Sequence, residues 1–309
     1  MSNITFDTLY FLPIQGKCKA GGWCDGKRFH SCPTGTFNRR TNSESQLDCE
    51  LCPPGFFCTG PGVDDYAPHV CKAGYYCPAG TRYETEFPCV AGTYNPDINQ
   101  TSHAVCKPCP QGYFCPQGSS SDTANKCPAG YYCPEETGNG RSFACPIGTY
   151  SEVNGLFNAS QCKTCPAGSY CPDGSELEPT IQPTLCPPGS YNPDEGAGHE
   201  FNCRPCDAGR SCPLSGLINS SHPCMEGHYC PNGTILNNQF PCLPGSYTNE
   251  TDLTSAEQCL LCPQSKSCGW GTGFPTKGWM DCRVGHYCPE GMLIILCYIY
   301  LAAMPKKDV

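Results

Sequence analysis

The sequence predicts a small, disulfide-rich, irregular fold with short β-strands, arranged as an elongated rod of tandem repeats. Cysteine accounts for 31 of the 309 residues, glycine for 34 and proline for 32. Leu, Ile, Val and Phe together number only 47, which is too few for the hydrophobic core of a globular domain of this length. A cysteine motif recurs along almost the whole chain, so disulfide bonds are expected to take the place of a core.

The recurring motif is Cys-x2-Gly-x-aromatic. It begins at fifteen cysteines, mostly 18 to 21 residues apart; fourteen have Gly three residues later, and thirteen have Trp, Phe or Tyr five residues later. The glycine predicts a backbone position with φ above zero, or one that another chain segment crosses closely. The aromatic ring is expected to cover a disulfide bond. These first cysteines are Cys18, Cys32, Cys52, Cys71, Cys89, Cys109, Cys127, Cys145, Cys165, Cys186, Cys206, Cys224, Cys242, Cys262 and Cys282.

Each first cysteine is followed by a second cysteine at one of two spacings. Ten units are short, with Cys-x5-Cys, and five are long, with Cys-x16-Cys. The order of one long and two short units predicts an N-terminal tail at 1–17, a partial repeat at 18–31, repeats at 32–88, 89–144, 145–185, 186–241 and 242–290, and an apolar C-terminal tail at 291–309. The repeat at 145–185 lacks one short unit. Asn-Pro-Asp sequences at 95–97 and 192–194 predict turns that open two long loops.

The spacing suggests how the cysteines pair. A bond across each long loop would restrict the unfolded chain and contribute about 3 kcal/mol. The expected pairs are Cys32–Cys49, Cys89–Cys106, Cys145–Cys162, Cys186–Cys203 and Cys242–Cys259. The spacing does not decide how the cysteines of the short units pair. Each unit could close on itself, or neighbouring units could interleave, as in Cys109–Cys127 with Cys115–Cys133. The unit at Cys165 lacks a short neighbour with which to interleave. Thirty cysteines are assigned in this way, and Cys297 is left over.

The cysteine content indicates an oxidising compartment, so the chain is expected to be extracellular or at the cell surface. Six Asn-X-Ser/Thr sequons agree with this and are candidate N-glycosylation sites: Asn3, Asn99, Asn158, Asn219, Asn232 and Asn249. The net charge of −9 and the scattered basic residues argue against a nucleic-acid partner. Residues 1–16 lack the features of a signal peptide, which favours a segment of a longer product.

The run from Cys89 to Gly118, CVAGTYNPDINQTSHAVCKPCPQGYFCPQG, resembles the ephrin-receptor-like cysteine-rich repeat, which is related in style to tumour-necrosis-factor-receptor modules. The same signature begins at Cys32, Cys145, Cys186 and, without its final Gly, Cys242, and the resemblance covers residues 18–290. It implies elongated, β-poor rods in large extracellular or membrane-anchored proteins, with adhesion, scaffolding or ligand presentation as their role. It also favours the interleaved pairing of the short units. The units at 206–212 and 262–268 depart from the pattern because they lack the aromatic residue.

Nothing in the sequence predicts a catalytic, cofactor or metal site, and we expect a non-enzymatic protein. Five Cys-x2-Cys pairs recur 41 to 57 residues apart, whereas zinc sites usually combine two such pairs about 12 to 20 residues apart. His228 and His286 occupy the same place in their units, where a packing role is expected.

The apolar run at 291–304 is too short to span a bilayer of about 30 Å as a helix, but it makes membrane contact possible. Lys306 and Lys307, which follow the run, would suit the cytoplasmic end of a membrane anchor. The alternatives are a truncated or mispredicted chain end and an apolar contact segment. The function expected overall is an extracellular structural or adhesion array, with protein partners or self-association and with N-glycans. The alternative is a ligand-binding receptor ectodomain.

Overall fold

The computed structural model describes residues 17–172, 181–273, 279–282, 286–291 and 298–299. Over these residues the secondary structure consists of eleven two-stranded antiparallel sheets and five single turns of 3-10 helix. Strands are two or three residues long, because Pro and Gly recur too often for longer ladders. The small, irregular, disulfide-rich fold class predicted from the sequence is confirmed.

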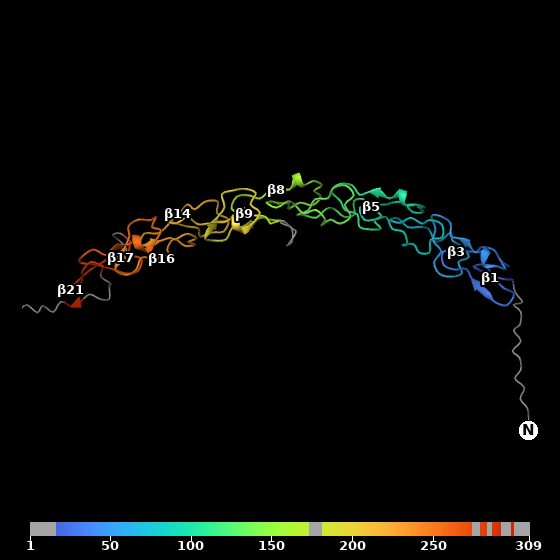
Figure 1. The fold of residues 1–309 in the computed structure, drawn as a ribbon, viewed down its shortest axis with the longest axis horizontal. Helices are drawn as coiled ribbons and strands as arrows, with labels where there is room; N and C mark the ends of the chain where they lie inside the picture. The colour runs from blue at the N-terminus through green and yellow to red at the C-terminus, as the bar shows by residue number, and fades with distance from the viewer. Residues whose placement is uncertain (1–16, 173–180, 274–278, 283–285, 292–297, 300–309) are drawn as a thin grey trace, which may run out of the picture. The chain divides into compact units, whose positions relative to one another are not determined.

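The chain divides into two compact units. The first is drawn from residues 1–144 and 153–161, and the second from residues 145–152 and 162–309, so the division falls at the start of a predicted repeat. In Figure 1, β1, β3 and β5 follow one another in chain order within the first unit. That unit contains β1 (Gly22–Cys24), β2 (Phe29–Ser31), β3 (Thr36–Phe37), η1 (Gln46–Asp48), β4 (Glu50–Leu51), β5 (Thr93–Tyr94), η2 (His103–Val105), β6 (Lys107–Pro108) and η3 (Ala159–Gln161).

The second unit is built in the same way, with β9, β14, β16 and β17 in chain order in Figure 1. It contains β7 (Thr149–Tyr150), β8 (Lys163–Thr164), β9 (Ser169–Tyr170), β10 (Thr184–Leu185), β11 (Ser190–Tyr191), η4 (Glu200–Asn202), β12 (Arg204–Pro205), β13 (Arg210–Ser211), β14 (His222–Pro223), β15 (His228–Tyr229), β16 (Phe240–Pro241), β17 (Ser246–Tyr247), η5 (Ala256–Gln258), β18 (Leu260–Leu261), β19 (Lys266–Cys268), β20 (Trp279–Asp281), β21 (His286–Tyr287) and β22 (Tyr298–Ile299).

Long and short units share one hairpin, and each unit, from one first cysteine to the residue before the next, is called a repeat from here on. The fourth and fifth residues after a first cysteine pair with the two residues directly before the next first cysteine. Thr36 pairs with Leu51 across a long loop, and Arg210 pairs with Pro223 in a short unit. The additional residues of a long loop are therefore inserted between two strands whose register stays the same.

All ten short units close on themselves. In the unit at 109–115, the turn at Gly112, with φ 83°, brings the Cα atoms of Cys109 and Cys115 to 5.8 Å, within the range that a disulfide bond spans. The interleaved pairing favoured by the resemblance is wrong, because Cys109 bonds Cys115 and Cys127 bonds Cys133. The five long loops are closed by Cys32–Cys49, Cys89–Cys106, Cys145–Cys162, Cys186–Cys203 and Cys242–Cys259.

Neighbouring repeats are joined by backbone hydrogen bonds that form a recurring clasp. Gly112 illustrates it: its N–H donates to the carbonyl oxygen of Cys133 at 2.8 Å, and its carbonyl accepts from the N–H of Cys127 at 2.9 Å. Both ends of one disulfide loop thus hold the glycine of the preceding repeat. A Cβ on Gly112 would also lie 2.9 Å from the carbonyl oxygen of Gly155, two repeats further along. Gly112 therefore has both of the features expected from the sequence, a positive φ and another chain segment passing close to it.

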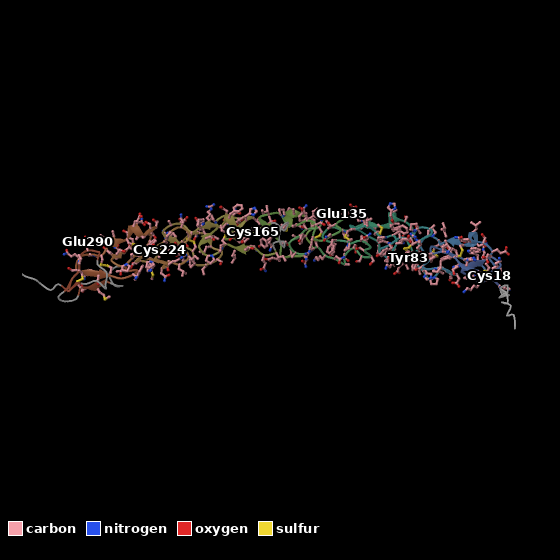
Figure 2. The ribbon with its side chains drawn as sticks, turned by 60° about the horizontal axis from the view of Figure 1, so that its bottom comes forward. Cys18, Tyr83, Glu135, Cys165, Cys224 and Glu290 are labelled. Atoms are coloured by element: carbon pink, nitrogen blue, oxygen red, sulfur yellow. A yellow bond between two sulfur atoms is a disulfide. The ribbon has the colours of Figure 1, made fainter. Side chains whose placement is uncertain are left out.

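Cysteines in disulfide bonds make up most of the buried apolar residues in the described chain. Among the described residues, buried cysteines are joined only by Phe37, Tyr131, Leu156, Ala197 and Leu253 as buried apolar side chains. In Figure 2 the disulfides run inside the coils, and oxygen and nitrogen atoms lie on the outside. Phe37 packs against the Cys52–Cys58 bond, so an aromatic ring covers a disulfide as expected, but it is the disulfide of the following repeat.

Candidate functional site

The two most exposed large apolar side chains among the described residues, Leu47 and Phe201, both lie in long loops. The loop between Cys186 and Cys203 shows how such a loop is built. Asn192 occupies the place that a short unit gives to its second cysteine, and it is 1% exposed. Its Oδ1 accepts from the N–H of Asp194 at 3.1 Å, and its Nδ2 donates to the carbonyl oxygen of Ser169 in the preceding repeat at 3.0 Å. The predicted Asn-Pro-Asp turn is confirmed, and it also ties two repeats together.

A clamped 3-10 turn follows in the same loop. The N–H of His199 donates to Oδ1 of Asn202 at 2.9 Å, which closes the turn η4 from its side chain. The middle residue of this turn, Phe201, is 78% exposed, and its ring stacks on His199 with centroids 4.7 Å apart. The loop therefore holds a large apolar side chain in solvent on a rigid support.

The same place in every long loop is exposed, but it carries a different residue each time. Leu47 is 92% exposed, and Phe201 is the second large apolar example. The five residues in this place, in chain order, are Leu47, Ala104, Ser160, Phe201 and Glu257, and all are exposed. The five long loops therefore share one scaffold, and the residue at the exposed turn differs from loop to loop.

A hollow of about 310 Å³ lies beside Phe201. Asp194, Glu195 and Arg204 contribute to its wall, and Arg204 forms an ion pair with Asp194 at 2.6 Å. Both members of this pair are more than half exposed, so the pair contributes little to stability. The hollow is open and lined by charged and polar groups, unlike the mostly apolar clefts that bind small molecules.

A second hollow, of about 460 Å³, lies near the start of the described chain and is lined in part by Asp25 and Glu44. His30 contacts Asp25 at 3.0 Å and stacks on Trp23 with ring centroids 4.3 Å apart. The hydrogen bond from His30, followed by those from the backbone N–H groups of Arg28 and Lys27, holds the pKa of Asp25 well below its usual range. Asp25 therefore stays ionised and ties the β1–β2 hairpin together.

The candidate glycosylation sites in the described part of the chain all have exposed asparagines: Asn99, Asn158, Asn219, Asn232 and Asn249. Asn3 lies outside the described residues. The threonines that complete two of these sequons differ in exposure. Thr101 is exposed, whereas Thr234 is 1% exposed and its hydroxyl donates a hydrogen bond to the carbonyl of Pro231. The sequon at Asn232 is therefore partly enclosed once the repeat has folded.

The Cys-x2-Cys pairs are divided between different disulfides. Cys49 bonds Cys32, whereas Cys52 bonds Cys58, and the other four pairs are split in the same way. Over the described ranges, no three His, Cys, Asp or Glu residues are grouped so that they could hold a metal ion. His228 lies against Gly271, two repeats further on, and the side chain of His286 is outside the described set.

The apolar run at 291–304 lies mostly outside the described residues, as does Cys297. Tyr298–Ile299 form β22, which pairs with β21. Where the structure describes the chain, it contains no helix of the length and apolar character needed to cross a membrane.

The sequence reasoning missed the polar residue that replaces the second cysteine near the start of each long loop. These residues are Asn38, Asn95, Ser151, Asn192 and Thr248, and all are buried. The sequence contains a pattern that could have identified them, since a polar residue lies six residues after the first cysteine of every long unit.

No protein-family model matches the chain, and no curated protein matches it significantly. The ephrin-receptor-like type therefore stays a resemblance. The structure itself is that of a cysteine-rich repeat array of the extracellular type, since the 15 disulfide bonds among the described residues are typical of an oxidising environment.

Proposed function

We propose that this chain is a non-enzymatic structural and adhesion array, extracellular or at the cell surface, in which covalently closed repeats hold binding loops at regular intervals. The observation that carries the proposal is the clasp between repeats together with the exposed turn of each long loop. The function would then depend on the distance between repeats and on the side chains that their loops expose. Other repeat proteins are built in the same way, since their units contact mainly their neighbours.

The contacts around Cys89 support a fixed spacing. Its N–H donates to the carbonyl oxygen of Gly74 in the preceding repeat at 2.9 Å, and its carbonyl accepts from the N–H of Gly118 in the following repeat at 2.9 Å. The disulfide bond to Cys106 joins Cys89, which makes both of these hydrogen bonds, to the end of its own long loop. Each repeat is thus tied to both neighbours through groups that do not depend on side-chain identity.

The partners that suit this array are proteins, including further copies of the same chain, and N-glycans attached to the exposed sequons. Exposed apolar residues on rigid turns can act as anchors that enter a pocket of a protein partner. The scattered basic residues and the negative net charge disfavour nucleic acid.

Small-angle X-ray scattering on the secreted chain tests the structural part of the proposal. A compact globule of 309 residues should have a radius of gyration of about 19 Å. The rod expected from the sequence requires a clearly larger value that does not depend on protein concentration. A value near 19 Å contradicts it, and the reduced, alkylated chain serves as the unfolded reference.

Bead aggregation tests the adhesive part. Beads coated with the chain should cluster with one another or bind cell surfaces, and pre-reduction of the disulfides should abolish this. Beads that stay dispersed and bind no cells would leave only a spacer role.

The alternative, a ligand-binding receptor ectodomain, is favoured by one specific feature, the exposed Phe201 beside the charged hollow. If a single ligand binds there, Phe201→Ala should abolish its binding while Glu257→Ala, the same change in the next long loop, has no effect. An adhesion array with several equivalent loops predicts only a partial loss for either variant.

A further inference from the structure

The chain contains three Asn-Gly pairs: Asn139-Gly140, Asn154-Gly155 and Asn232-Gly233. In such a pair the backbone nitrogen of Gly can attack the side-chain carbonyl carbon of Asn, since Gly has no side chain to hinder the approach. The attack requires that nitrogen to be free of other bonds. The structure distinguishes the three pairs on this criterion.

Two of the pairs belong to the clasp between repeats. The N–H of Gly155 donates to the carbonyl oxygen of Cys127 at 2.7 Å, and the N–H of Gly233 donates to the carbonyl oxygen of Cys206 at 2.8 Å. The nitrogen of each glycine is therefore committed to a bond that links two repeats. That bond must break before the nitrogen can react.

The pair Asn139-Gly140 lies in a turn and takes no part in the clasp. Asn139 is exposed, and the N–H of Ser142 donates to its backbone carbonyl at 3.1 Å. Gly140 is buried, and a Cβ there would lie 2.7 Å from the ring of Phe114. No hydrogen-bond acceptor for the N–H of Gly140 is found in the described part of the chain. The N–H of Arg141 donates to Oδ1 of Asn139 at 3.0 Å. This donor polarises the side-chain carbonyl and would stabilise the oxyanion that forms when the carbon is attacked. Asn154 has an equivalent donor, since the N–H of Ala129 donates to its Oδ1 at 2.8 Å, so the two pairs differ in the bonding of the glycine nitrogen.

We propose that Asn139 is a site of spontaneous modification, at which the asparagine converts to isoaspartate and aspartate in the folded protein. The deprotonated nitrogen of Gly140 forms a bond to the Cγ of Asn139, and the bond from Cγ to Nδ2 breaks. The departing Nδ2 group takes up the proton that the nitrogen of Gly140 lost and leaves as ammonia, and a five-membered cyclic imide remains. Water then opens this ring at either carbonyl. Opening at the former backbone carbonyl carbon gives isoaspartate, and opening at Cγ gives aspartate.

The modification changes what this turn presents. The isoaspartate product carries a carboxylate two residues before Arg141, whose side chain is exposed and has no ion-pair partner among the described residues. Unmodified protein has a neutral amide there. Aged protein thus gains a negative charge two residues from the positive charge of Arg141, and the isoaspartate product lengthens the main chain by one methylene at this point. The inference concerns a chemical change of the chain and holds whether or not the array is adhesive.

Peptide mapping by mass spectrometry tests the proposal on the full secreted chain, incubated at neutral pH and physiological temperature with its disulfides intact. Isoaspartyl methyltransferase labelling identifies the isoaspartate product. Conversion at Asn139 should be about tenfold or more faster than at Asn154, because the bond from Gly155 to Cys127 must open first. Asn232 is scored in the fraction that carries no glycan there. Asn139→Ser should abolish most labelling, whereas Asn154→Ser should leave it unchanged.

The reduced, denatured chain provides the comparison, since all three pairs should then convert at similar rates. Equal rates in the folded chain, or protection of Asn139 relative to Asn154, would overturn the proposal. Labelling that survives Asn139→Ser would do the same.

Discussion

The side-chain amide of Asn95 donates a hydrogen bond to the carbonyl oxygen of Tyr75, 3.0 Å away in the preceding repeat. The same amide donates to the carbonyl of Asp97, and Oδ1 accepts from the N–H of Asp97, both at 3.0 Å. Asn95 is 1% exposed. A short repeat has a cysteine in this place, and that cysteine is bonded within its own repeat, as Cys115 is to Cys109. The side chain of Asn95 instead links its repeat to the preceding one.

Asn95→Ala should therefore lower the free energy of unfolding by about 1–3 kcal/mol, because it leaves buried backbone groups without partners. Thermal unfolding followed by circular dichroism measures the change. Asn238→Ala is the matched control, since Asn238 is exposed, and its effect should stay within about 0.5 kcal/mol. Equal effects of the two variants would show that the amide of Asn95 has no special role.

A comparison of Gly189 with Gly26 distinguishes the two structural reasons for a glycine, a positive φ and the close approach of another chain segment. Both have φ of +85°, but a Cβ on Gly189 would lie 2.8 Å from the carbonyl oxygen of Gly233, whereas a Cβ on Gly26 meets nothing within 4 Å. Gly26→Ala should cost about 1–2 kcal/mol for the backbone conformation alone. Gly189→Ala should cost more, because the next-but-one repeat must also move. Chemical denaturation gives both values, and a smaller loss for Gly189→Ala would argue against this contact between repeats.

Glu136 has a φ of 62° in a place that most repeats fill with glycine. Its N–H donates to the carbonyl of Cys109 at 2.9 Å, as the N–H of Gly118 does to Cys89. Glu136→Gly should stabilise the chain by about 0.5–1 kcal/mol, since a residue with a Cβ is disfavoured there. Glu135→Gly, one residue earlier, should destabilise it instead. The two unfolding midpoints should move in opposite directions.

Asp25 should remain ionised on acidification below about pH 3.9, the usual value for an unfolded aspartate. Because its pKa is lowered on folding, Asp25 contributes stability above that pH, and the contribution is lost as pH falls through the lower folded value. Carbon-detected NMR titration of the carboxyl group measures this. His30→Gln should move the midpoint upward, but not fully to 3.9, because the N–H groups of Lys27 and Arg28 still donate. An unchanged midpoint would remove His30 as the main cause.

Glycosylation at Asn99 and Asn232 should be tested with different substitutions. Asn99 has a φ of 59°, which Gln would adopt only with strain, so Thr101→Ala is the change that spares the backbone. Thr234 is buried, so Asn232→Gln is the better choice for the second site. Each variant, secreted from eukaryotic cells, should lose the mass of one glycan. Identical mobility before and after glycosidase treatment would exclude glycans at both sites.

Local sequence was sufficient to predict short β-strands, the long loops and the special backbone at the motif glycine. Ser265 shows how strong that requirement is, because it lacks the glycine and still has a φ of 68°. Asn192 was predictable as a turn residue, but not as a link to Ser169, since that contact joins residues 23 positions apart. The displayed Phe201 was not predicted, because its exposure depends on a turn that the side chain of Asn202 closes.

The amino-acid sequence by itself determined that cystine would replace a hydrophobic core and that two cysteine spacings would set the length of every repeat. Composition and spacing are sufficient for this, because too few aliphatic residues are present to bury. Only the tertiary structure decided that Cys109 bonds Cys115 rather than Cys127. The spacing allows both pairings, and the choice depends on the turn at Gly112, whose N–H and carbonyl are held by the two ends of the next repeat.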